Sequence, residues 1–198
     1  MNPDKFPLIS LYLYLSGRCN LRCRYCWVAP VAPEDGPEKL VAFDVLAEAI
    51  LRAKELGLSW IKLTGGEPFI RGDIIELLRF LRREELQIDI ESNGTMIDGD
   101  MARILRECGV RQVSISLDAA RAELHEWLRG LSGCHARAVD ALRHLGKEGI
   151  TRQIIMSLYA ENIGEIEPLA ALCDELDVPS LKINPIMPTG RGKKVFQC

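Results

Sequence analysis

The chain has 198 residues, which is enough for one domain with a substantial core and too few for two domains of ordinary size. Apolar residues make up 47% and charged residues 27%, a composition that excludes an intrinsically disordered chain. The formal net charge of -3 excludes the strongly basic field that binds nucleic acid. We therefore expect a single domain over residues 1–198, with no nucleic-acid partner.

The start of the chain predicts neither a membrane span nor an export signal. The longest apolar run there, LISLYLYL, is too short to cross a bilayer. The preceding MNPDKFP lacks the basic head of a signal peptide. We therefore expect a cytoplasmic protein with no membrane partner.

Short β-rich runs alternate with helical patterns along the chain. In chain order, we predict a strand at 8–15, a helix at 42–56, a strand at 59–64, a helix at 73–83, a strand at 87–92, a helix at 98–108, a strand at 111–117, a helix at 135–147, a strand at 151–158, a helix at 163–176 and a strand at 180–186. Gly57, Gly109 and Gly149 follow three of these helices, which we expect them to end.

This series predicts an α/β fold with a parallel sheet, because repeated β-α units join parallel strands through right-handed crossovers. Six such units coil toward a barrel but fall short of the closed eight-fold form. In parallel α/β folds the ligand site lies at the carboxyl ends of the strands. The segments that follow the first four strands are SGRCNLRCRYC, GGEP, SNGT and LDA, so we expect the functional site there.

Three of the seven cysteines, Cys19, Cys23 and Cys26, fall within eight positions. An odd, clustered set favours ligand chemistry in a reducing compartment over a disulfide framework. Zinc would need a fourth ligand, such as His125, His135 or a distant cysteine. A cubane 4Fe-4S cluster on three cysteines instead leaves one iron open to a substrate or cofactor. The spacing favours the cluster, because zinc sites usually present paired CxxC knuckles.

The remaining cysteines and the histidines carry no motif. Cys173 falls on an apolar helical face, where we expect it to be buried, and the three histidines are expected to be surface or packing residues. The sequence assigns no role to the other scattered cysteines, which are Cys108, Cys134 and Cys198.

The second strand ends in the segment GGEP, residues 65 to 68. Gly65 and Gly66 allow close backbone approach, and Glu67 followed by Pro68 supplies a carboxylate and free carbonyls. Such a loop suits an ammonium group. Taken alone, the segment is equally compatible with an ordinary β-α turn.

Together these motifs resemble the radical S-adenosylmethionine (SAM) superfamily. Its hallmark CxxxCxΦC, with an aromatic residue at Φ, is matched by Cys19, Cys23, Tyr25 and Cys26, and GGEP is its second hallmark. The resemblance implies a partial (β/α)6 TIM-like barrel with parallel strands. It also implies a [4Fe-4S] cluster held by the three cysteines, with the amine and carboxylate of S-adenosylmethionine on the fourth iron.

The same resemblance implies a set of cofactor-binding residues. Tyr25 would lie near the adenine and residues 65 to 68 near the methionine amine. The other positions that match the family are Ser92, Asn93, Gly94, Ser116, Asp118 and Asn162. Local structural roles remain open for these: helix or turn capping for residues 92 to 94, Asp118 and Asn162, and a strand face for Ser116.

The end of the chain, LKINPIMPTGRG, resembles the branch that contains molybdenum-cofactor cyclases and SPASM-type peptide maturases. Lys182 and the pair Gly190-Arg191 match positions of that branch, and both basic side chains are suited to a carboxylate. For Lys182, simple solvation at the surface is an equally good interpretation. Members usually continue into a cysteine-rich extension with auxiliary clusters. Because this sequence stops at Cys198, we expect that extension to be absent or truncated.

The resemblance implies reductive cleavage of S-adenosylmethionine to a 5'-deoxyadenosyl radical that abstracts a substrate hydrogen. A low-potential electron donor of the flavodoxin or ferredoxin type would be a partner. The MPTGRG segment favours peptide or protein modification, with small-molecule or cofactor biosynthesis as the first alternative. A non-catalytic zinc or iron-sulfur module is the second alternative.

Overall fold

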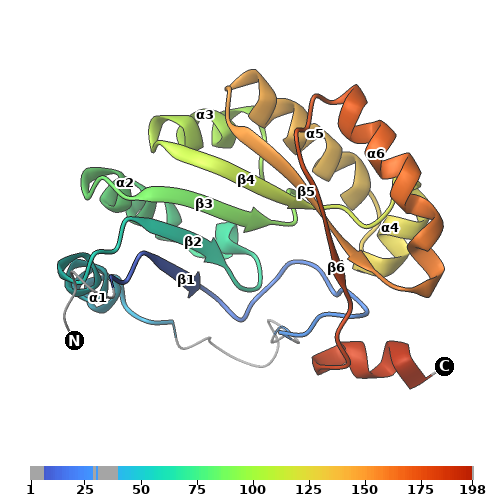
Figure 1. The fold of residues 1–198 in the computed structure, drawn as a ribbon, viewed down its shortest axis with the longest axis horizontal. Helices are drawn as coiled ribbons and strands as arrows, with labels where there is room; N and C mark the ends of the chain where they lie inside the picture. Colours follow the sequence, from blue (N-terminus) through green and yellow to red (C-terminus); the bar gives the residue numbers. More distant parts are fainter. Residues whose placement is uncertain (1–6, 29, 31–39, 198) are drawn as a thin grey trace.

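The computed structural model describes residues 7–28, 30 and 40–197. Six strands form one parallel sheet in the order β1-β2-β3-β4-β5-β6 (Figure 1). Their bounds are β1 Ser10–Tyr14, β2 Trp60–Thr64, β3 Gln87–Ser92, β4 Val110–Ser116, β5 Thr151–Leu158 and β6 Leu181–Pro185. The sheet curls into a half-barrel, which confirms the predicted partial (β/α)6 fold.

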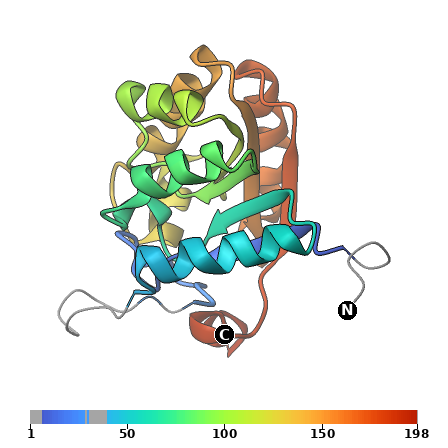
Figure 2. The ribbon, with the colours of Figure 1, turned by 90° about the vertical axis from the view of Figure 1, so that its left-hand side faces the viewer.

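Helices cover the outer face of the curled sheet (Figure 2). They are α1 Phe43–Glu55, α2 Ile74–Arg83, α3 Gly99–Glu107, α4 Ala122–Arg129, α5 Cys134–Lys147 and α6 Ile166–Glu175. The core lies between the two layers, because alternate strand side chains such as Ile61, Ile90 and Ile115 point to the helices and are fully buried. The other strand face is therefore free to carry polar and aromatic side chains on the concave side.

Glycines end the helices where the sequence predicts it. Gly57, Gly109 and Gly149 have φ angles of 101°, 71° and 70°, in the left-handed region that favours glycine. At the other end of α3, the Asp98 carboxylate accepts a hydrogen bond of 2.9 Å from the Met101 N–H. Turn chemistry thus fixes the short loops between strands and helices.

Two features differ from the sequence prediction. Helix α4 was not predicted, because its eight residues present too short an apolar pattern to stand out. A 3-10 turn, η3 Ala160–Glu165, replaces the start of the helix expected from residue 163. There the Asn162 side chain accepts a hydrogen bond of 2.9 Å from the Tyr159 N–H, which fixes a turn before α6 begins.

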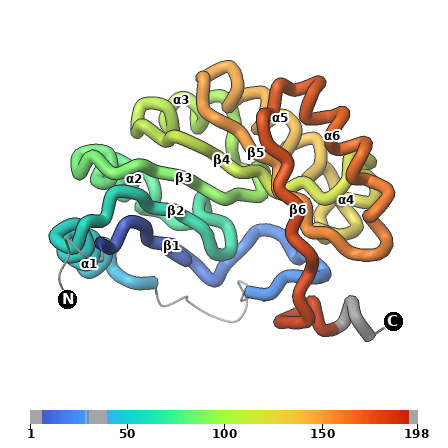
Figure 3. The backbone as a smooth tube through the Cα atoms, viewed as in Figure 1, coloured from blue at the N-terminus to red at the C-terminus, as the bar shows by residue number. Residues whose placement is uncertain are grey.

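The C-terminal segment returns to the cysteine loop after β6 (Figure 3). It contains the 3-10 helix η4 Gly190–Gln197, and the Arg191 N–H donates to the Cys26 carbonyl at 2.9 Å. Cys198 lies outside the described residues. Within the described ranges, every helix is too short or too polar to cross a bilayer.

Two glycines that flank the loop after α4 provide a test of how this helix supports the cysteine loop. Gly130 and Gly133 both have positive φ angles, 69° and 73°. A Cβ on Gly130 would lie 2.9 Å from the Arg22 carbonyl oxygen, whereas a Cβ on Gly133 would meet nothing within 4 Å. The two positions therefore share the backbone strain and differ in crowding.

We expect Gly133→Ala to lower the free energy of unfolding by about 1 kcal/mol, the cost of a left-handed alanine. Gly130→Ala should lower it by about 1–3 kcal/mol more, because the cysteine loop must also shift. Urea denaturation of both variants measures the difference. Equal losses would show that α4 and the loop around Arg22 are not tightly packed.

Candidate cofactor and metal site

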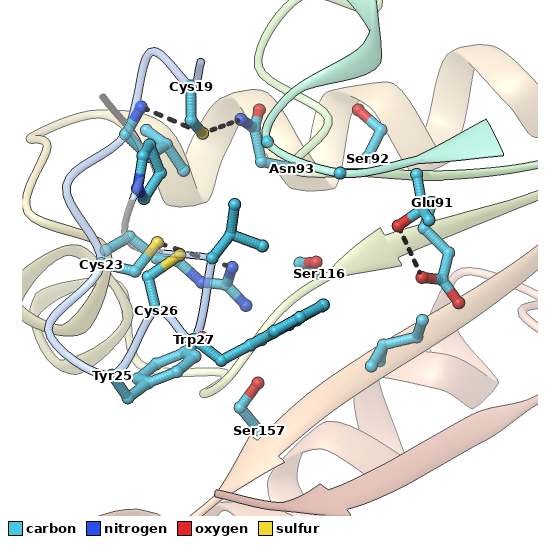
Figure 4. Close-up of a pocket in the computed structure, with 18 of the residues that line it drawn as sticks. Cys19, Cys23, Tyr25, Cys26, Trp27, Glu91, Ser92, Asn93, Ser116 and Ser157 are labelled. Atoms are coloured by element: carbon cyan, nitrogen blue, oxygen red, sulfur yellow. Dashed lines mark hydrogen bonds between the residues drawn. The ribbon is translucent and has the colours of Figure 1, made fainter. Parts of the chain in front are cut away.

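A pocket of about 230 Å³ opens at the carboxyl ends of the strands (Figure 4). The cysteine loop forms one wall, and the ends of β2 to β6 form the other. Ten of the residues singled out in the sequence line it: Cys19, Cys23, Tyr25, Cys26, Gly65, Gly66, Ser92, Asn93, Ser116 and Lys182. The parallel topology thus brings together residues as far apart in the sequence as Cys19 and Lys182.

Three other predicted residues, Glu67, Pro68 and Asp118, are buried behind this pocket and are not among its lining residues. Pro68 begins the 3-10 turn η2 Pro68–Ile70. The carboxylates of Glu67 and Asp118 are bound by protein donors. These contacts hold the walls of the pocket in place.

Glu67 links the ends of β2 and β3. Its carboxylate accepts hydrogen bonds of 2.9 Å from the Ser92 hydroxyl and the Asn93 N–H, and one of 3.4 Å from the Phe69 N–H. Burial raises the pKa of Glu67 to about 7, although these donors oppose the rise. The Asn93 amide extends the link, because its Nδ2 donates to Asn20 at 2.8 Å and to the Cys19 Sγ at 3.7 Å.

Asp118 makes the corresponding link between β4, β5 and the cysteine loop. Its carboxylate accepts from the Tyr25 hydroxyl at 2.5 Å, from Arg129 Nη2 at 2.8 Å and from the Ser157 N–H at 2.9 Å. The Asn162 amide donates to the Asp118 carbonyl at 2.9 Å, so this predicted residue also serves the same corner. Both Asp118 and Arg129 are almost completely buried.

The cysteine loop docks on GGEP through backbone hydrogen bonds. The Gly66 N–H donates to the Ser16 carbonyl at 2.7 Å, and the Glu67 N–H donates to the Arg18 carbonyl at 2.8 Å. Gly65 has a φ angle of 124°, and a Cβ on Gly66 would lie 1.8 Å from the Arg18 carbonyl oxygen. Position 65 therefore requires glycine because of its positive φ angle. Position 66 requires glycine because the Arg18 carbonyl leaves no room for a Cβ.

The cysteine sulfurs fit a thiolate-bound metal cluster. Cys19 Sγ accepts from the Leu21 N–H at 3.4 Å and Cys23 Sγ accepts from Arg129 Nη1 at 3.9 Å, and such donors stabilise thiolate ligands. Burial raises the pKa of the Cys19 thiol to about 11, so binding a metal must release its proton. Among the described residues, no three potential ligands surround a single metal ion. A cubane needs a different arrangement, because each thiolate binds a different iron.

Several lining residues were not found by sequence reasoning. Arg129 contacts Cys23, and Glu91 accepts from Lys62 at 3.4 Å and from Thr64 at 3.1 Å on the concave face. Trp27 meets Tyr14 edge to face, with ring centroids 5.5 Å apart. The alternation of β2 and β3 side chains could have indicated Lys62 and Glu91, because both point away from the apolar core.

A second pocket of about 390 Å³ adjoins the first and shares Tyr25, Trp27, Ser157 and Asn184 with it. Lys182 and Asn184 of β6 both line the first pocket. The two cavities therefore form a continuous polar and aromatic region from the cysteines to the end of β6.

The sequence profile of the radical SAM superfamily matches residues 13–173, the region that carries this pocket. The chain belongs to the radical SAM superfamily. Members of this family use a [4Fe-4S] cluster and S-adenosylmethionine. The donor set of three cysteines with N–H groups directed at two of the sulfurs fits such a cluster.

Relatives with named activities support this assignment. The chain is 33% identical to an AdoMet-dependent heme synthase from Oleidesulfovibrio alaskensis over 89% of its length, and 29% identical to the mycofactocin maturase MftC of Mycobacterium ulcerans over 96%. It spans about half the length of these relatives, namely 45% and 50%. The Streptococcus suis protein SuiB, solved with bound S-adenosylmethionine, shares the fold with a TM-score of 0.80 at 21% identity, covering 92% of this chain and 41% of SuiB.

The close approach at Gly66 yields a prediction with a matched control. We expect Gly66→Ala to lower the free energy of unfolding by about 3 kcal/mol or more, because the new methyl group must displace the backbone of the cysteine loop. Gly72→Ala, whose Cβ would meet nothing within 4 Å, should remain close to wild type. Chemical denaturation compares the two. A Gly66→Ala protein as stable as Gly72→Ala would contradict the described docking of the loop on GGEP.

Proposed function

We propose that this chain carries the catalytic site of a radical SAM enzyme, with Cys19, Cys23 and Cys26 as ligands of a [4Fe-4S] cluster. The observation that supports this most directly is the single pocket shared by the three cysteines and the strand-end motifs. When bound and reduced, the cluster supplies one electron that breaks a carbon-sulfur bond of S-adenosylmethionine, giving methionine and a 5'-deoxyadenosyl radical that abstracts a substrate hydrogen.

The residues of the chain would bind and orient the cofactors. Gly65 and Gly66 bring their backbone to the pocket, where its carbonyls are suited to the methionine ammonium group. Ser92, Asn93 and Ser116 supply polar side chains next to these glycines, on the wall formed by the strand ends. Glu67 and Asp118 would act indirectly, by holding Asn93 and Tyr25 in place.

Replacement of the cysteines tests the proposal. Cys19→Ala, Cys23→Ala and Cys26→Ala should each lose the cluster, measured as iron and sulfide content after anaerobic reconstitution, and should form no 5'-deoxyadenosine above background. Cys173→Ala is the matched control, because Cys173 is a free, buried cysteine on α6 away from the pocket. Retention of a full cluster in all three site variants would refute the ligand assignment, and zinc in place of iron would support the non-catalytic alternative.

For the substrate, we propose a peptide. The similarity to the mycofactocin maturase supports this choice, and so do the two adjoining pockets that extend from the cysteines to the end of β6. In the described part of the chain, β6 pairs only with β5, which leaves backbone groups on its other edge for an extended peptide. The second pocket, with Trp27 and Met187 in its lining, would accept an apolar side chain next to that edge.

A small-molecule substrate is the second candidate, favoured by the 33% identity to the heme synthase. Incubation of the reduced protein with S-adenosylmethionine and a perdeuterated peptide digest distinguishes the two. We expect deuterium in the 5'-deoxyadenosine that forms. Deuterium transfer from a deuterated iron porphyrin carboxylate, but not from the peptides, would show that the substrate is a small molecule.

We also propose a cytoplasmic setting with an electron donor of the flavodoxin or ferredoxin type. Cys108, Cys134 and Cys173 are free and buried, as suits a reducing compartment. An external reductant is required by the chemistry, because each cleavage of S-adenosylmethionine consumes one electron. We further propose that residues 1–198 act as one core domain, since a single sheet joins all six strands.

A further inference from the structure

Helix α4, which the sequence did not reveal, is joined to the cysteine loop by two backbone hydrogen bonds. The Arg22 N–H donates to the Arg129 carbonyl at 3.1 Å, and the Arg24 N–H donates to the Leu128 carbonyl at 2.9 Å. These two hydrogen bonds lie on either side of Cys23 in the sequence. The last turn of α4 therefore fixes the backbone of this cysteine.

The Arg129 side chain extends from the same turn into the protein interior. Its Nη2 donates to Asp118 Oδ1 at 2.8 Å, and its Nε lies 2.7 Å from Asp118 Oδ2. Its Nη1 lies 3.9 Å from Cys23 Sγ, and its guanidinium carbon lies 5.5 Å from the centroid of the Tyr25 ring. The two side chains of the ion pair are only 7% and 0% exposed.

A buried ion pair of this kind is costly, because both charges lose their water. The Asp118 carboxylate partly offsets the charge of the guanidinium at Cys23, but it pairs with Nε and Nη2, whereas Nη1 contacts the sulfur. The arrangement thus presents the positive end of a fixed dipole to Cys23, in a region of low dielectric where the charge is weakly screened. A neutral thiol gains little from this dipole, whereas a thiolate that holds a negatively charged cluster gains much.

We propose that Arg129 is a positioning residue for the cluster, whose guanidinium, fixed by Asp118, donates to the Cys23 thiolate and favours the reduced state. This inference rests on the proposed function, in which Cys23 holds one iron. Reduction adds one negative charge to the cluster, and nearby positive charge and hydrogen bonds to its sulfurs stabilise that charge. Arg129 would therefore make the cluster easier to reduce.

The test is the midpoint potential of the reconstituted cluster, measured without S-adenosylmethionine by redox titration with electron paramagnetic resonance detection. Arg129→Met alone would leave the Asp118 charge buried and unpaired, so the main variant is Arg129→Met combined with Asp118→Asn, which removes the pair as a unit. Arg129→Lys keeps the charge. Arg24→Met is the matched control, because it removes an exposed cation next to Cys23 in the sequence together with a side-chain hydrogen bond to α4, from Arg24 Nε to the Trp127 carbonyl at 3.0 Å, and leaves the guanidinium at Cys23 in place.

We expect the double variant to shift the midpoint to a more negative potential, so that the ratio of reduced to oxidised cluster at the wild-type midpoint falls roughly tenfold. Arg129→Lys should recover most of this loss, and Arg24→Met should behave as wild type because solvent screens its charge. An unchanged potential in a double variant with a full cluster would overturn the inference alone. A wild-type protein that binds no cluster would overturn the proposed function and this inference together.

Discussion

The site depends on the hydrogen bonds that the buried Asp118 carboxylate accepts. This carboxylate is completely buried two residues beyond the end of β4, and a buried charge is tolerated only when donors surround it. The donors that it recruits come from the cysteine loop through Tyr25, from α4 through Arg129 and from β5 through Ser157. Satisfying one charge therefore assembles three separate segments of the chain around the pocket.

Glu67 has the same function on the other side of the pocket. Its carboxylate joins the exits of β2 and β3, and through Asn93 it reaches the sulfur of Cys19. The cysteine loop, which has almost no regular structure, is thus held between two buried acids and the backbone contacts of GGEP. These contacts hold the three sulfurs in place and leave the pocket open for the cofactors.

The sequence predicted the strands, the main helices and about half of the pocket-lining residues, because the carboxyl ends of parallel strands must meet at one edge. Order along the chain alone was enough to gather Cys19, Gly65, Ser92 and Ser116. It could not place the Glu67 carboxylate behind the wall, since that orientation depends on donors from β3. It also missed Arg129. This residue lies on a short helix that the sequence pattern does not reveal, and its ion pair with Asp118 can be seen only in the folded structure.

Three cysteine ligands would leave one iron of the cluster open to S-adenosylmethionine. The most direct measurement is electron paramagnetic resonance of the anaerobically reconstituted, dithionite-reduced protein with and without S-adenosylmethionine, with 5'-deoxyadenosine assayed in the same tube. We expect a 4Fe-4S signal that changes on addition of S-adenosylmethionine, together with formation of the nucleoside. A cluster signal that is indifferent to S-adenosylmethionine, with no 5'-deoxyadenosine, would show that no iron of this cluster is open to the cofactor.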